Sequence, residues 1–256
     1  MTEPSGAAKL RSVTSGTLPH PGRIAREQRT GGGKSGALRA GIFGMNDGLL
    51  SNLSLIMGVT GAGVSNSAIL LTGIAGLLAG AFSMAAGEYI SMRSQRELFE
   101  HLIHQEAHEL GTDPDAEHEE LAGIYSARGI PADLASQLAT AIMRDPKLAL
   151  DTHAREELGL DPDELGSPWA AAGSSFVAFA FGALVPLVSY LIGSGVAAAT
   201  VSIAVSAVTL FAVGAALSRF TGKRVVVSGA RMLLVGTAAA ALTFLVGRLL
   251  HVTTGL

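Results

Sequence analysis

The chain has 256 residues, of which 48% are hydrophobic, 15% charged and 5% aromatic, and its formal net charge is −3. The charged fraction is low, because about 25% is usual in soluble globular domains. The sequence contains no cysteine, which excludes disulfides, thiolate metal sites and cysteine nucleophiles. A slightly acidic chain also argues against a nucleic-acid partner, which would require a basic surface.

Residues 1–39 are predicted to be a disordered basic tail. Their composition is rich in Gly, Ser, Pro and Thr, as is typical of disordered segments. No apolar stretch of the kind found in secretory signal peptides is present, so we do not expect a cleavable signal. Gly33-Lys34-Ser35 resembles the end of a P-loop, but Gln28 stands where that motif needs its first glycine. We interpret this segment as a linker.

Five stretches are apolar and long enough to cross a bilayer as helices, since about 20 mainly apolar residues suffice. They are residues 41–62, 68–92, 169–191, 195–218 and 227–250. The sequence therefore predicts an all-α membrane protein, with spans 1 and 2 in residues 40–92 and spans 3 to 5 in residues 168–256. A soluble bundle of buried helices is the alternative, but three strongly apolar runs in one short chain argue against it.

Lys and Arg residues beside the spans indicate which loops are cytoplasmic. The basic tail precedes span 1, and further basic residues follow span 2 and span 4, whereas the links after spans 1 and 3 are uncharged. One arginine near the outer end of span 5 is the exception. We predict a cytoplasmic N-terminus and an outside C-terminus, in the cell membrane of a bacterium or the vacuolar membrane of a eukaryote.

Residues 93–167 form an acidic insert between spans 2 and 3, which this topology makes cytoplasmic. From Glu97 to Glu164 there are 17 acidic and four basic residues, so the net charge is 4 − 17 = −13. No proline interrupts residues 68–110, so span 2 is predicted to continue as one helix, about 65 Å long at 1.5 Å per residue. Cap and breaker residues predict three further helices, ending near residues 127, 143 and 158. The insert should be a small helical bundle.

Three residues in the first two spans are candidates for a metal path. Asp47 lies in span 1, and Met84 and Glu88 lie one turn apart in span 2. Ionisable groups inside a membrane are costly and indicate function, and a carboxylate with a thioether suits Fe²⁺ better than Mg²⁺ or Ca²⁺. The structural alternatives are an interfacial position or a buried helix-packing bond for Asp47, and an interfacial position for Glu88. For Met84 they are lipid contact or core packing, which for this residue alone is the simpler interpretation.

Small residues recur at helical spacing in both of these spans. They are Gly41, Gly44 and Gly48 in span 1, and Gly73, Gly76, Gly80, Ser83 and Gly87 in span 2. In lipid, such seams allow helix backbones to approach closely. We interpret them as packing surfaces that also permit oligomerisation.

Carboxylates in the insert are spaced so that they share helix faces. Glu106 and Glu109 are three apart, as are Glu117 and Glu120, and Glu157 could join them. Clustered carboxylates repel unless a cation compensates, which favours a divalent metal, although a solvated acidic surface is the alternative. A second set of residues also shares one helix face and comprises Glu97, His101, His104 and His108. We interpret this stripe as a solvated helix face, and binding of Zn²⁺ or Fe²⁺ is the alternative.

Several motifs together resemble the vacuolar iron transporter family over about residues 39–250. They are Phe43-Gly44-Met45-Asn46-Asp47-Gly48-Leu49, Gly80-Ala81-Phe82-Ser83-Met84-Ala85-Ala86-Gly87-Glu88-Tyr89, Glu120-Leu121-Ala122-Gly123-Ile124-Tyr125 followed by Arg128-Gly129-Ile130, Glu157-Leu158-Gly159-Leu160, and Gly229-Ala230-Arg231. The resemblance implies five spans, a homodimer and a cytoplasmic helical metal-binding domain. It also implies export of Fe²⁺, often with Mn²⁺, in exchange for protons.

The resemblance also implies roles for single residues. Asp47 and Met84 match positions of the translocation path, and His153 stands near a position where plant members have Met, a ligand of different hardness. The carboxylates that match the cytoplasmic metal site are Glu106, Glu109, Glu117, Glu120 and Glu157. Fe²⁺ is then expected as cargo, with Mn²⁺, Zn²⁺ and Co²⁺ as further candidates, and no prosthetic group.

Two other classes of function are compatible with these residues. A membrane-anchored metal buffer or sensor would bind metal in the insert without moving it across the membrane. A ferroxidase would require facing Glu-x-x-His motifs on paired helices, but the Glu and His residues of the stripe have the wrong spacing. We therefore expect a transporter and not an enzyme.

Overall fold

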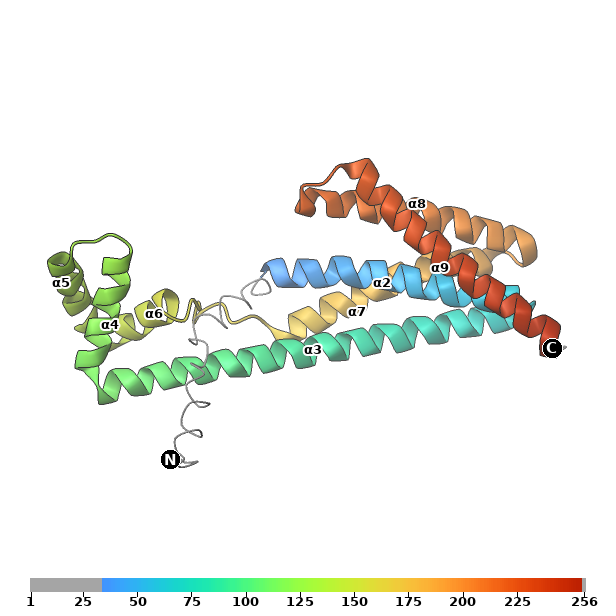
Figure 1. The fold of residues 1–256 in the computed structure, drawn as a ribbon. Coiled ribbons are helices and arrows are strands. Elements are labelled where there is room, and N and C mark those ends of the chain that lie inside the picture. The colour runs from blue at the N-terminus through green and yellow to red at the C-terminus, as the bar shows by residue number, and fades with distance from the viewer. Residues whose placement is uncertain (1–33, 255–256) are drawn as a thin grey trace, which may run out of the picture. The chain divides into compact units, whose positions relative to one another are not determined.

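The computed structural model describes residues 34–254, and all regular secondary structure in this part of the chain is helical, as predicted. Figure 1 shows the eight helices found there. They are α2 (Lys34–Gly61), α3 (Asn66–Thr112), α4 (Pro114–Ala127), α5 (Ala132–Met143), α6 (Pro146–Glu156), α7 (Pro168–Ile192), α8 (Gly195–Thr221) and α9 (Val225–Thr254). The predicted basic tail, residues 1–39, lies almost entirely outside the described residues.

The described chain forms two compact units. One, here called the span unit, comprises residues 34–95 and 166–254; the other, the helical insert, comprises residues 96–165. The long helix α3 contributes its first part to the span unit and its last part to the insert.

Five helices contain apolar stretches long enough to cross a membrane, which confirms the number of predicted spans. The candidates are Gly41–Gly61, Asn66–Thr112, Pro168–Ile192, Gly195–Ser218 and Val225–Leu250. Many large apolar side chains on these helices are exposed, among them Leu71, Phe82, Ile192, Val196 and Leu242. Exposed apolar surface on this scale would be a liability in water but is the expected outer face of a helix bundle in lipid.

Helix α2 packs against α7, α8 and α9 in the span unit, and the crossing of α9 over its neighbours is visible in Figure 1. Leu49, Leu53 and Ile56 of α2 lie in the main hydrophobic core, together with Leu187 of α7 and Leu210 of α8. This core holds the polar residues of the first span on a defined face of the bundle.

Glycines allow the backbones of α2 and α7 to touch. A Cβ at Gly182 would lie 2.0 Å from the carbonyl oxygen of Met45, and one at Gly48 would lie 2.1 Å from that of Phe179. Gly247 and Gly61 make an equivalent crossing between α9 and α2, where a Cβ would lie 1.9 Å from the carbonyl oxygen of Gly58 and 2.2 Å from that of Phe244, respectively. These contacts cannot relax by side-chain rotation, because the clashing atoms belong to the backbone.

Replacing Gly182 with alanine is therefore expected to destabilise the span unit by roughly 1–3 kcal/mol, the usual cost of overpacking. Gly173→Ala on the same helix is the matched control, because no described atom of another helix lies within 4 Å of a Cβ there. Thermal unfolding of both variants in detergent measures the difference. Equal melting temperatures would contradict the close approach of α2 and α7.

The glycine seam of α3 packs over most of its length. Added Cβ atoms at Gly73 and Gly76 would lie 2.5 Å from the side chains of Leu187 and Leu55, and one at Gly80 would lie 2.1 Å from the ring of Phe179. Gly87 differs, because no described atom lies within 4 Å of its added Cβ. The seam thus brings α3 against α2 and α7 at the level of the polar residues.

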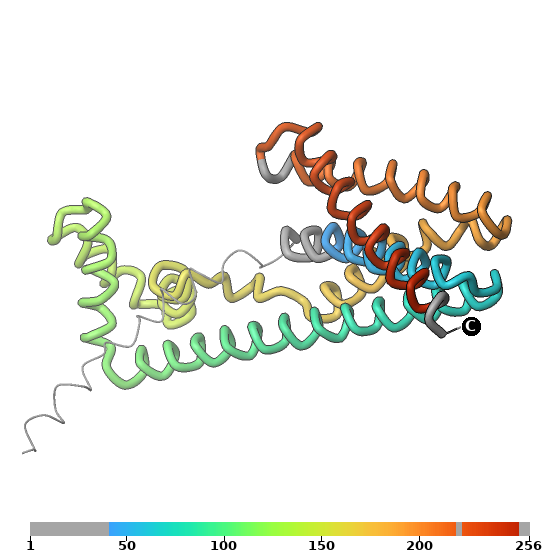
Figure 2. Tube along the Cα trace, turned by 45° about the vertical axis from the view of Figure 1, so that its right-hand side comes forward, coloured from blue at the N-terminus to red at the C-terminus, as the bar shows by residue number. Residues whose placement is uncertain are grey.

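Two helices of the helical insert begin directly after an aspartate that caps them. Asp113 caps α4 by accepting a hydrogen bond from the backbone N–H of Ala116, and Asp145 caps α6 by accepting from Lys147 and Leu148. A proline follows each cap at the first helical position, where its missing N–H is not needed. Figure 2 shows how α4, α5 and α6 fold back on one another through short turns.

Candidate functional site

Four side chains from three helices of the insert come together in its interior. Glu106 lies near the end of α3, Glu117 on α4 and His153 on α6, and Glu157 is the residue that ends α6. Each offers one ligand atom, and these atoms all lie within 4.8 Å of one another. Within residues 34–254 this is the one such group of three or more His, Asp or Glu residues.

The imidazole Nδ1 of His153 is at the centre of the group. It lies 2.9 Å from Glu106 Oε1, 3.5 Å from Glu117 Oε2 and 3.9 Å from Glu157 Oε2. A tetrahedral site with metal–ligand bonds of about 2.1 Å has ligand–ligand separations of about 3.4 Å. The observed distances bracket that value, so small side-chain movements would suffice to enclose a metal ion.

Burial makes this group unusual for charged residues. His153 is fully buried and Glu106 is 3% exposed. Nevertheless, the imidazole Nδ1 of His153 and the carboxylate oxygens that face it make no hydrogen bonds to described residues. The 2.9 Å contact between His153 and Glu106 is an ion-pair distance without hydrogen-bond alignment. Buried carboxylates in this state need a cation or a proton to compensate their charge.

In the absence of metal, protons take that place. Burial, followed by repulsion from Glu106, raises the pKa of Glu117 from 4.5 to about 7. Burial alone would lower the pKa of His153, but the carboxylates of Glu106, Glu157 and Glu117 outweigh it and raise this pKa from 6.5 to about 9. Near neutral pH the metal-free group therefore holds protons that a metal ion must displace.

The affinity of the insert for divalent metal is expected to rise with pH. Both pKa values are raised in the folded state, so these two groups contribute most to the folding stability of the metal-free protein at low pH. The contribution of Glu117 is lost as the pH rises from 4.5 to about 7, and that of His153 as it rises from 6.5 to about 9. For each proton that the metal displaces, the affinity for the metal rises by up to about tenfold per pH unit.

Titration of the full-length protein with Mn²⁺ between pH 6 and pH 8.5 measures this dependence. Glu164→Gln, at an exposed position of the same unit, should leave the slope unchanged. An affinity that does not vary over this range would contradict a proton-occupied metal-free site.

Three ion pairs fix the end of α6, close to His153 and Glu157. Arg155 donates to Asp151 at 2.9 Å and also pairs with Asp161 in the segment that follows the helix. Arg155 thereby lowers the pKa of Asp161. Arg128 at the end of α4 pairs with Glu156. These contacts are exposed and weak individually, but they tie α6 to its neighbours on either side of the site.

The other predicted ligands of the insert lie outside the group of four. Glu109 is partly exposed and accepts a hydrogen bond from Gln105. Glu120 is exposed, although its charge still contributes to the raised pKa of Glu117. The stripe formed by Glu97, His101, His104 and His108 is exposed along its whole length, as expected of a solvated helix face.

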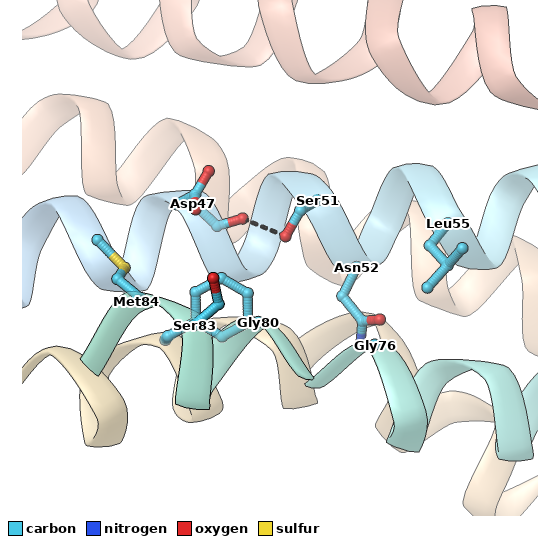
Figure 3. Close-up of a pocket in the computed structure, with 9 residues that line it drawn as sticks. Asp47, Ser51, Asn52, Leu55, Gly76, Gly80, Ser83 and Met84 are labelled. Atoms are coloured by element: carbon cyan, nitrogen blue, oxygen red, sulfur yellow. Dashed lines mark hydrogen bonds between the residues drawn. The ribbon is translucent and has the colours of Figure 1, made fainter. Parts of the chain in front are cut away.

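A second polar site is a cavity of about 320 Å³ in the span unit, between α2 and α3. Figure 3 shows Asp47 on α2 and Met84 on α3 at one end of this pocket, with Asn52 and Gly76 at the other. Its remaining lining residues are Ser51, Leu55, Gly80, Ser83 and Phe179. The hydroxyl of Ser51 donates to the backbone carbonyl of Asp47 at 2.6 Å.

Two of the three residues predicted for a metal path thus share a pocket. Asp47 and Met84 line it, whereas Glu88 is not among the lining residues. Asn52 and Ser83 line it as well, but sequence reasoning did not single them out as ligands. The available signal was that Asn52 is an uncharged polar residue in the middle of a predicted span, a position where polar groups are rare.

Five apolar helices and polar residues held between them define an α-helical integral membrane protein. Residues 38–248 match the sequence profile of the VIT family. The chain therefore belongs to this family, as the motifs in the sequence indicated.

Relatives with curated names match over most of their length. Vacuolar iron transporter 2 of Oryza sativa subsp. japonica is 31% identical over 204 residues, which cover 79% of this chain and 83% of the relative. Vacuolar iron transporter of Acanthamoeba castellanii is 34% identical over 223 residues, covering 84% and 79%. Vacuolar iron transporter 1 of Arabidopsis thaliana is 30% identical over 211 residues, covering 82% and 84%.

Proposed function

We propose that this protein exports Fe²⁺, and also Mn²⁺, from the cytoplasm in exchange for protons, without catalysing a chemical reaction. Membership of the VIT family supports metal transport, and relatives from plants and an amoeba are named as vacuolar iron transporters. The observation that carries the proposal is the pocket among the spans, where the carboxylate of Asp47 and the thioether of Met84 line one cavity.

The chemistry of this pocket suits a borderline divalent ion. A carboxylate binds hard cations such as Mn²⁺ well, while a thioether adds affinity for softer ions. Fe²⁺, Mn²⁺, Co²⁺ and Zn²⁺ are therefore candidate substrates. In the proposed cycle, protonation of Asp47 or Glu88 on the outer side weakens metal binding and couples release to proton entry.

The proposed orientation places the N-terminus and the helical insert in the cytoplasm and the C-terminus outside. It rests on the basic residues that flank the cytoplasmic ends of the spans. In this arrangement the insert meets metal on the side from which it is exported. Its four-residue group, Glu106, Glu117, His153 and Glu157, would bind the ion before or during transport.

A homodimer is proposed as the transporting unit. Asp47, Ser51 and Leu55 are spaced four residues apart on α2, line the pocket and are exposed in the single chain. A carboxylate exposed to lipid is costly, so a second copy that covers this edge of the pocket would remove the cost. Cross-linking of cysteines introduced at exposed positions of α2 tests this arrangement.

Transport is tested with the full-length protein in proteoliposomes. Flux of Fe²⁺ and Mn²⁺ is followed with and without an imposed pH gradient, and proton movement is recorded with an internal pH indicator. The proposal expects metal flux that accelerates with the gradient and moves protons in the opposite direction. Metal binding without flux would overturn it.

That last outcome would favour a membrane-anchored metal buffer or sensor. The observation behind this second candidate is that the buried four-residue group belongs to the insert and not to the spans. A buffer requires the insert to bind metal but does not require Asp47 or Met84.

A further inference from the structure

Asn52 is a buried polar residue of the span unit, and packing between helices accounts for only one end of its amide. It lies on α2, is 2% exposed and lines the pocket that also contains Asp47 and Met84. Figure 3 shows its side chain directed towards Gly76 on α3.

The orientation of the Asn52 amide is fixed by chemistry. Its Nδ2 donates a hydrogen bond of 2.6 Å to the backbone carbonyl of Ala183 on α7. A carbonyl oxygen can only accept, so the amide nitrogen must face α7 and the amide oxygen must be turned away from it. That Oδ1 is buried and has no hydrogen-bond partner among the described residues.

Gly76 of α3 lies directly beside this oxygen. A Cβ at position 76 would lie 2.9 Å from Asn52 Oδ1, closer than a carbon atom normally approaches an unbonded oxygen. Glycine therefore lets α3 lie this close to the amide, beside the pocket that both residues line. A buried, oriented carbonyl oxygen without a partner is a ready acceptor for a cation or a proton donor.

We propose that Asn52 Oδ1 is a ligand for the divalent cation that the pocket carries. The inference rests on the proposed transport function and adds a binding residue to it. The amide supplies a neutral, hard oxygen at the end of the pocket away from Asp47, so it binds the ion there without adding charge. Nδ2 serves to hold that oxygen in place against α7.

This role predicts a change in metal preference. Carbonyl oxygens favour Mn²⁺, whereas a thioether favours softer ions such as Zn²⁺. Asn52→Leu, which keeps the volume but removes the oxygen, should raise the apparent KM for Mn²⁺ by about tenfold and that for Zn²⁺ by only about two- to threefold. Met84→Leu should shift the ratio in the opposite direction.

Flux of Mn²⁺ and Zn²⁺ into proteoliposomes, with thermal unfolding of each variant in detergent, tests the inference. Ser202→Ala is the matched control: Ser202 is fully buried and donates to the backbone carbonyl of Pro186 at 2.7 Å, but does not line the pocket. It removes a comparable helix-to-helix hydrogen bond and should leave the Mn²⁺/Zn²⁺ ratio unchanged.

Asn52→Asp distinguishes loss of the ligand oxygen from loss of helix packing. A protonated Asp side chain can donate to Ala183 and keep an oxygen in the pocket, so its metal ratio should return towards that of the wild type. If the wild-type protein transports metal, either of two results would overturn the inference. One is an unchanged Mn²⁺/Zn²⁺ ratio in Asn52→Leu, and the other is the same ratio in Asn52→Asp and Asn52→Leu. Absence of flux in the wild type would instead overturn the proposed function.

Discussion

Replacing Asp47 with alanine is expected to reduce metal flux in proteoliposomes by about 100-fold or more, because the variant removes the only carboxylate that lines the pocket of the described span unit. Asp47→Asn, which keeps the shape of the side chain but not its charge, should cause a similar loss. Flux of Fe²⁺ or Mn²⁺ under a pH gradient is the measurement.

Two comparisons separate transport from folding. Asp47 is exposed in the single chain, so neither variant should lower the melting temperature in detergent. Metal binding by the insert should also persist, because its four ligand atoms belong to the other unit. Normal flux in Asp47→Ala would refute the proposed path, and loss of insert binding would show that the effect is indirect.

Glu106→Gln is expected to weaken binding of Mn²⁺ to the insert on the order of 100-fold, since even the supporting residues of metal sites are worth about 10–100-fold. Glu106 is the most deeply buried carboxylate of the four-residue group and lies closest to His153. The variant is nearly isosteric, so its effect reports the loss of charge and of one ligand oxygen. Calorimetric titration of the full-length protein measures the affinity.

Glu109→Gln is the matched control on the same helix. Glu109 lies three residues from Glu106 and was also predicted as a ligand, but it is partly exposed and bonded to Gln105. Its substitution should change the affinity by less than about threefold, as expected for a partly screened charge. Equal losses in the two variants would mean that the metal site extends beyond the four grouped residues.

The sequence by itself determined the helices and their order. Long apolar runs require spanning helices because backbone polar groups cannot remain unsatisfied in lipid, and the charge distribution separated the insert from the spans. Cap and breaker residues predicted three helices in the insert, and the structure has α4, α5 and α6 there. These features are local in the chain, so they can be predicted from spacing and composition.

Only the tertiary structure decided which predicted ligands come together. The spacing of Glu106 and Glu109 shows that they share a helix side, but packing against α4 and α6 buries Glu106 beside His153 and leaves Glu109 at the edge. The contact of Asn52 with Ala183, 131 residues away along the chain, likewise depends on the crossing of α2 and α7. Burial and orientation arise from contacts between distant helices, and helical periodicity carries no information about them.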